Sequence, residues 1–131
     1  MGITFPDAWS GLSRPHERFE LEDKLDELAQ PERTALWTSQ GTEVQGGGID
    51  ETLRFFFDGR ALDRSAIGAS LFDDREAVAV RMVTNALDAV FKTNRRGDSR
   101  YFLRHRGWKQ VQSTAQSAHR LMIANDVARS G

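Results

Sequence analysis

The sequence predicts an all-α fold: a compact single-domain bundle of about five to seven helices over residues 1–131. First, apolar residues recur at spacings of three and four in residues 17–29, 75–91 and 108–127, as on one face of a helix. Second, 131 residues, 39% of them hydrophobic and 28% charged, suit one globular core. Third, glycine, proline and small polar residues separate these segments and predict turns.

The first long helix is expected over residues 17–29, with Ser13 as its N-cap and Pro15 in its first turn. Leucines form its apolar face, and the other face is strongly acidic. The acidic residues are Glu20, Glu22, Asp23, Asp26 and Glu27. This face is either a solvated surface, partly balanced by Lys24, or an anionic surface offered to a basic partner.

Residues 44–59 are the predicted packing centre of the chain. Three glycines, Gly46 to Gly48, permit a sharp turn because glycine adopts positive φ without steric cost. They do not predict a phosphate loop, since neither a following Lys-Ser/Thr nor the spacing of a dinucleotide fingerprint is present. Phe55 to Phe57 then form a large apolar block that must be buried.

The secondary structure of this block is open to two interpretations. Adjacent aromatic residues favour a strand, whereas Asp50 as N-cap, Glu51 near the helix dipole and Gly59 as a stop favour a helix. We expect the helix. The alternative is an α+β fold with a small two- or three-stranded sheet at Leu53–Phe57 and Arg100–Leu103.

Two further helices complete the prediction. Asp73 or Asp74 is expected to cap a helix over residues 75–91, whose polar stripe is so narrow that it should be central and covered on most sides, with Phe55 to Phe57 as neighbours. The C-terminal helix, residues 108–127, is amphipathic. Its apolar stripe is Trp108, Val111, Ala115, Ala118 and Met122.

Charge is unevenly distributed along the chain although the net charge is only -1. Residues 1–91 carry seventeen Asp/Glu and nine Lys/Arg, whereas residues 92–131 carry nine Lys/Arg and two Asp. Either these halves neutralise each other in the fold, or they form one acidic and one basic face.

The basic segment is the alternative binding region. Its candidate nucleic-acid contacts are Arg95, Arg96, Arg100, Arg104, Arg106 and Lys109. Arginines could contact phosphates while Trp108 or Tyr101 stacks on a base. The competing interpretation buries Trp108 and leaves the arginines solvated. Because net charge is near zero, nucleic-acid binding is the second choice.

No residue pattern predicts catalysis, a metal site or a cofactor. His16, His105 and His119 lack metal-ligand spacing, and the chain has no cysteine. The N-terminal residues do not resemble a secretory signal, and no apolar run has membrane-spanning length. We therefore expect a soluble, cytoplasmic protein that is not an enzyme.

Residues 43–91 resemble a bacterial family of small helical proteins that includes a DNA mimic. The family pattern is Glu-Val/Leu, Asn-Gly-Gly-aromatic, a Phe-Phe doublet, Asn-Ser and an alanine-rich helix. Here the corresponding residues are Glu43-Val44, Gly46-Gly47-Gly48-Ile49, Phe55-Phe56-Phe57 and the helix from Ala77 to Phe91. Gly46 and Ile49 depart from the motif, as does Asp58-Gly59 in place of Asn-Ser. The resemblance implies a helical fold that acts by binding another protein.

The function expected from these observations is a non-enzymatic protein-binding module of the inhibitor, immunity or DNA-mimic type. Its acidic helix face is expected to engage a basic protein partner through charge complementarity.

Overall fold

The fold is all-α over the residues that the computed structural model describes, 5–38, 48–58, 62–93 and 99–130. Apart from an isolated bridge between Ile67 and Leu71, these ranges contain no β-structure, so the predicted α+β alternative is wrong. The elements are η1 (Asp7–Trp9), α1 (Pro15–Ala29), α2 (Pro31–Ala35), α3 (Ile49–Phe57), η2 (Arg64–Ala66), α4 (Asp74–Phe91), α5 (Ser99–Arg104) and α6 (Trp108–Ser130).

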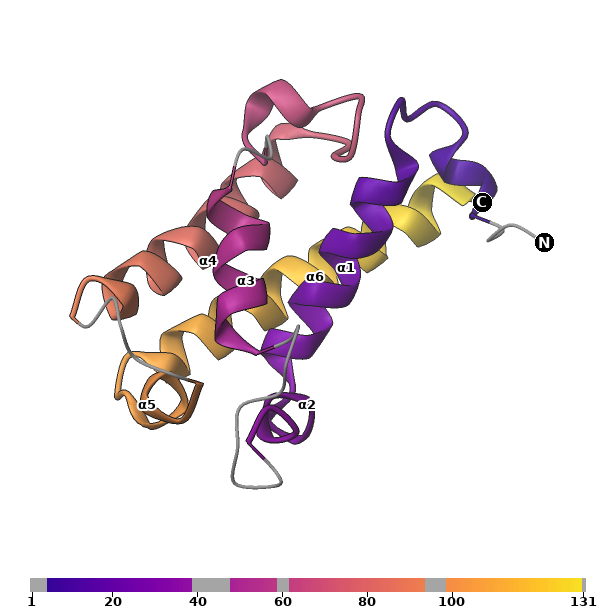
Figure 1. Ribbon diagram of the computed structural model, residues 1–131. Coiled ribbons are helices and arrows are strands. Elements are labelled where there is room, and N and C mark those ends of the chain that lie inside the picture. Colours follow the sequence, from indigo (N-terminus) through magenta and orange to yellow (C-terminus); the bar gives the residue numbers. More distant parts are fainter. Residues whose placement is uncertain (1–4, 39–47, 59–61, 94–98, 131) are drawn as a thin grey trace.

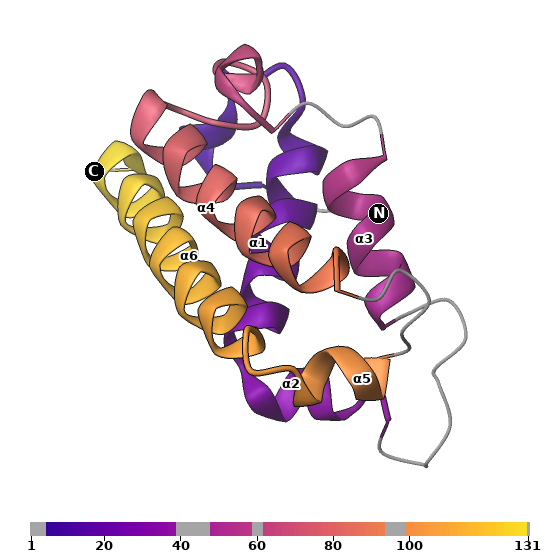
Figure 2. The ribbon, with the colours of Figure 1, turned by 90° about the vertical axis from the view of Figure 1, so that its left-hand side faces the viewer.

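Helix α6 forms one side of the bundle (Figure 2). Helices α1 and α4 both pack along it, and α3 lies on the opposite side of the layer that α1 and α4 form (Figures 1 and 2). The short helices α2 and α5 lie at the same end of the bundle, near the start of α6 (Figure 2). Nearly all the buried apolar side chains form one cluster, which includes residues of all the described α-helices except α2.

The predicted apolar stripe of the C-terminal helix is confirmed. Val111, Ala115, Ala118 and Met122 are fully buried and Trp108 is nearly so. Two of these residues are alanines, whose small side chains let neighbouring helices approach closely. The prediction that the 75–91 helix is covered on most sides is wrong, because Val78 and Met82 of α4 are about half exposed.

Residues 53–57 and 100–103 are helical because their large side chains face the core at helical spacing. In α3, Phe55 and Phe56 are buried whereas Phe57 is 45% exposed, so two of the three phenylalanines join the core. Helix α3 begins one residue before the expected cap Asp50. The Ile49 N–H donates to the Ser99 Oγ at 3.0 Å, which ties α3 to α5.

The start of α1 also differs from the prediction. Ser13 makes no side-chain cap; Arg14 precedes the helix and Pro15 opens it. The Ser13 and Arg14 N–H groups instead donate to the carbonyls of Gly68 and Ala69. The cap of α4 is Asp73, whose carboxylate accepts the Glu76 N–H at 3.0 Å. Gly46, Gly47 and Gly59 lie outside the described residues.

Candidate functional site

The carboxylates on the acidic face of α1 differ in exposure, and some of them form ion pairs within the protein. Glu20 and Asp23 are exposed, whereas Asp26 and Glu27 are partly buried. Asp23 and Asp26 both bind Arg33 of α2, at 3.2 and 2.8 Å. Burial favours a raised pKa for Asp26, but hydrogen bonds from Arg33 and Gln30 outweigh it and the pKa is lowered. Asp26 is therefore ionised at neutral pH.

A hollow of about 410 Å³ separates this face of α1 from α3. Its α1 wall carries Glu20, Asp23 and Glu27, and its α3 wall carries Glu51. Among the described residues that line it, Lys24 is the cation, and its Nζ lies 3.0 Å from Glu27 and 3.2 Å from Glu51. In this part of the chain, four carboxylates therefore face one cation across the hollow. The chain concentrates negative charge here by combining two helices.

A second hollow, of about 330 Å³, lies on the other side of α1, against α6. It shares Phe19 and Asp23 with the first and adds Glu22, Asp26 and His119. Phe19 is 45% exposed, so an aromatic ring stands between two acidic hollows. The combined surface is apolar at its centre and acidic around it. We call Phe19, Glu20, Asp23, Asp26, Glu27 and Glu51 the acidic surface.

Glu22 differs from the other predicted acidic residues because its side chain, although it borders the second hollow, is mostly buried. Its side chain is 13% exposed. Burial raises its pKa to about 9, and the hydrogen bond and negative charge of Asp126 contribute further. Glu22 therefore carries a proton at neutral pH and adds no charge to the acidic surface.

Glu22 borders a buried charge cluster centred on Arg18, which is fully buried. The guanidinium binds Glu76 of α4 in a bidentate manner, at 2.8 and 3.0 Å, and donates from Nε to Asp126 of α6 at 3.0 Å. The carbonyls of Ser70 and Met122 accept its two remaining N–H groups. All five donors are therefore used.

Aromatic residues enclose the same cluster. The Arg18 guanidinium lies 4.1 Å from the ring centre of Phe72, close enough for a cation–π contact. The Trp9 indole N–H donates to Asp126 at 2.8 Å. Since the guanidinium has no donor left for a ligand, we interpret the cluster as the tie between η1, α1, α4 and α6.

This cluster was not predicted from the sequence, although the sequence contains a signal for it. Each charged residue occupies the apolar stripe of its own helix. Arg18 precedes Leu21 and Leu25 at helical spacing, and Asp126 follows Met122 by four residues. A charge on an apolar stripe predicts burial, and a buried charge requires a partner.

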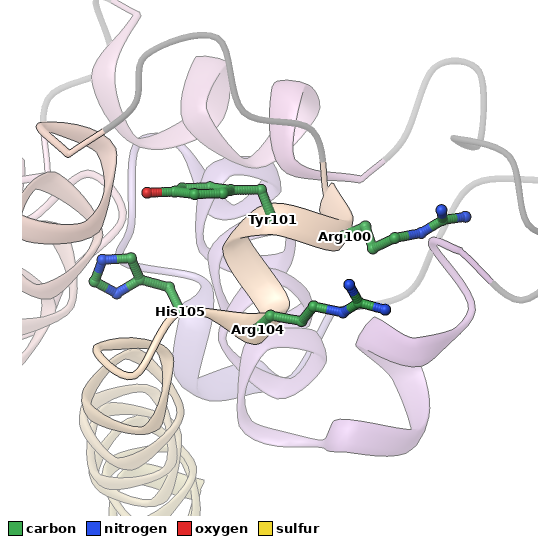
Figure 3. Close-up of a pocket in the computed structure, with 4 residues that line it drawn as sticks. All are labelled: Arg100, Tyr101, Arg104 and His105. Atoms are coloured by element: carbon green, nitrogen blue, oxygen red, sulfur yellow. The ribbon is translucent and has the colours of Figure 1, made fainter.

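The basic segment forms a separate pocket on α5. A hollow of about 350 Å³ is lined by Arg100, Tyr101, Arg104 and His105 (Figure 3). The two arginine side chains extend to one side of the helix and the two rings to the other (Figure 3). Arg106 and Lys109 are exposed nearby in the chain, but they are not part of this lining. Arg95 and Arg96 lie outside the described residues.

Trp108 is not available to stack on a base. It is 4% exposed, and its ring packs edge-on against Trp37 with centroids 6.0 Å apart. The part of the interpretation that buries Trp108 is therefore confirmed. Tyr101 is the aromatic residue that borders the basic pocket.

Neither surface resembles a metal centre or a membrane segment. Across the described ranges, no three His, Asp or Glu side chains are grouped so as to hold a metal ion. Among the helices of that same part of the chain, none combines the length and apolar character needed to cross a membrane.

Comparison with known proteins identifies one family. The family model described as "Domain of unknown function (DUF7945)" matches residues 12–130. The match covers all six α-helices. No curated protein and no solved structure was found to match the chain. The resemblance to the DNA-mimic family stays a prediction.

Proposed function

The chain belongs to the DUF7945 family, whose description assigns no function. From the geometry of the acidic surface, we propose that the protein is a non-enzymatic module that binds a basic segment of a protein partner. The observation that carries the proposal is the hollow between α1 and α3, whose described lining residues include four carboxylates from two helices and one cation, Lys24.

Charge complementarity supports this choice of partner. The acidic surface has five carboxylates. Among the described residues, Lys24 is shared by Glu27 and Glu51, and Arg33 is shared by Asp23 and Asp26, so each of these cations faces two carboxylates. Such a surface attracts a Lys/Arg-rich segment and repels nucleic acid and other polyanions.

Phe19 supports a protein partner over a small cation. An exposed aromatic ring in the middle of a charged rim is typical of interface anchors, which supply most of the binding energy once water is excluded. Here the rim carboxylates would fix the register of the basic segment while Phe19 provides apolar contact.

The test is binding of a fluorescent peptide rich in Lys, Arg and Leu, followed by anisotropy at two salt concentrations. The variant E20Q/D23N/E51Q removes three exposed carboxylates. At about 0.5 kcal/mol for each exposed ion pair, we expect about a tenfold weaker affinity. Glu27 is left unchanged because it also accepts the Trp37 indole N–H.

The matched control is E32Q/D58N/D74N, which removes three exposed carboxylates outside the hollow. It should bind as the wild type does. F19A should also weaken binding, and by the same amount at both salt concentrations because the lost contact is apolar. If the two triple variants lost the same amount of affinity, net charge alone would explain the effect, and the surface proposed here would be refuted.

The inhibitor, immunity and DNA-mimic types differ in what the basic partner normally binds. For the DNA-mimic type, the partner is itself a DNA-binding protein. Once a partner has been purified with the chain, duplex DNA should compete for it. If DNA does not compete, the DNA-mimic type is excluded and the other two types remain.

A further inference from the structure

The pocket on α5 takes no part in the proposed function, and its lining differs in chemistry from the acidic surface. The described residues that line it contribute two guanidinium groups, an imidazole and a phenol, and none of them is a carboxylate. Its volume, about 350 Å³, lies near the lower end of the range of about 300–1,000 Å³ for small-molecule sites. The pocket therefore suits a small anionic ligand.

Helix geometry separates the pocket into two functional sides. Arg100 and Arg104 are one turn apart and extend in the same direction, so their guanidinium groups lie on one side (Figure 3). Tyr101 and His105 are likewise one turn apart, with ring centres 6.0 Å apart. A ligand in this pocket meets cations on one side and aromatic surface on the other.

The aromatic side is held in place by contacts outside the pocket. The Tyr101 hydroxyl is hydrogen-bonded to Thr93 Oγ1 at 3.0 Å. The His105 Nδ1 accepts the Gly107 N–H at 2.9 Å, which leaves Nε2 as the ring's donor. A Cβ at Gly107 would lie 3.0 Å from both His105 Nδ1 and Val90 Cγ2, so a larger residue would displace the imidazole.

The cationic side has an exposed charge available. Arg104 is exposed, and it takes part in no ion pair within the described part of the chain. Arginine binds phosphate oxygens through paired N–H donors, and a planar base stacks on an aromatic ring. A nucleotide combines both groups at the separation of one sugar.

We infer that the α5 pocket binds a nucleotide unit, with its phosphate at Arg104 and Arg100 and its base against Tyr101 and His105. The unit could be a free nucleotide or part of a single-stranded nucleic acid, because both present the same phosphate and base. Arg120 of α6 serves as a control position distant from the pocket. It lies twelve residues, or about 18 Å, along that helix from Trp108, the first residue of α6.

The experiment measures binding to the full chain of three probes: 5′-AMP, a fluorescent ten-residue oligo(dT) and inorganic phosphate. Saturable, salt-sensitive binding of AMP or of the oligonucleotide is expected. R104E should weaken it at least tenfold, and R120E, which makes the same charge change on exposed α6 surface, should change it less than twofold. Circular dichroism establishes that both variants are folded.

The probes distinguish the two sources. Binding of both AMP and oligonucleotide assigns a site for a single nucleotide, and binding of the oligonucleotide alone assigns single-stranded nucleic acid. The inference is overturned if neither binds, if phosphate competes as well as AMP does, or if R120E and R104E weaken binding equally. G107A serves as a second variant: it should weaken base-containing probes and leave the peptide binding described above unchanged.

Discussion

Arg18 retains a charge inside the protein because every one of its N–H groups has an acceptor. Burial alone would lower its pKa, but the hydrogen bond to Glu76 and the negative charges of Glu76 and Asp126 outweigh burial and raise it. The cost of such a site appears when one partner is removed, since the other charge is then buried and unpaired.

Replacement of Arg18 by alanine should therefore be severely destabilising. Glu76 is fully buried and would lose its cation, so we expect R18A to lower the free energy of unfolding by about 3–5 kcal/mol. Urea denaturation followed by circular dichroism measures this loss. R14A removes an exposed arginine with a weak ion pair to Glu17 and should cost under about 1 kcal/mol. Similar losses for R14A and R18A would contradict the interpretation of the cluster.

Glu22 gives the pH dependence of stability a definite sign. Its pKa is about 9 in the folded protein and ordinarily near 4.5. Between these values the folded chain holds a proton that the unfolded chain has released, so stability falls as pH rises through this window, by up to about 1.4 kcal/mol per pH unit. The effect is absent below about pH 4.5 and complete above about pH 9.

The isosteric variant E22Q tests the contribution of the Glu22 proton to stability. Glutamine needs no proton to stay neutral, so E22Q should be more stable than the wild type at pH 8 by a larger margin than at pH 5. Thermal unfolding at both pH values measures the margin. A margin that does not grow with pH would show that Glu22 is ionised in the folded protein.

At the scale of the element, helix ends are decided by specific side chains. Asp73 caps α4, and its other carboxylate oxygen also accepts from Asn125 of α6 at 3.2 Å. Asp74, the next residue, has an exposed ion pair with Arg64. The two aspartates were indistinguishable in the sequence, because both precede the apolar pattern of α4.

Alanine substitution should separate these two aspartates. D73A should lower the free energy of unfolding by about 1–2 kcal/mol through loss of the cap. D74A should change it by under about 1 kcal/mol, since exposed pairs contribute little. Chemical denaturation of both variants is the measurement, and a larger loss for D74A would contradict the assignment of the cap.

Helix boundaries and types were predictable where the signal is local. The apolar stripe of α6 follows from its spacing alone, and Asp73 was one of two predicted caps. The start of α3 was not predictable, because the Ile49 N–H is satisfied by Ser99, fifty residues away. Residues 53–57 were ambiguous since adjacent phenylalanines fit a strand or a helix, and packing against α4 decided between them.

At the scale of the whole molecule, one core and the Arg18 cluster connect the helices into a single unit. Leu25 is fully buried in that core on α1, whereas Trp108 lies in the same core on α6. Loss of packing at one helix should therefore destabilise all of them together.

The variant L25A tests this cooperativity. It should lower the free energy of unfolding by about 2–5 kcal/mol, and tryptophan fluorescence and far-ultraviolet circular dichroism should report the same transition midpoint. L36A, at a residue 63% exposed, should have little effect. Two separate midpoints in L25A would show that the helices do not unfold as one domain.

The candidate sites were predictable in kind and only partly in position. All five predicted acidic residues line the hollows beside α1, although Glu22 carries no charge there, and Glu51 joins them from a helix that was assigned no part in binding. Glu22 was grouped with them because helical spacing alone does not show which neighbours bury a side chain. Arg100 and Arg104 both line the α5 pocket because a spacing of four residues places them on the same face of the helix, which is a local property of the sequence.

The sequence by itself determined the helical class, the apolar faces of α1 and α6 and the separation of an acidic from a basic region. These properties depend on spacing and charge along the chain, which are local. Only the tertiary structure decided that Arg18, Glu76 and Asp126 meet, that Glu22 keeps a proton, and that α3 closes one side of the acidic hollow. Those properties depend on the distance and desolvation of groups from helices far apart in the sequence, and packing alone sets both.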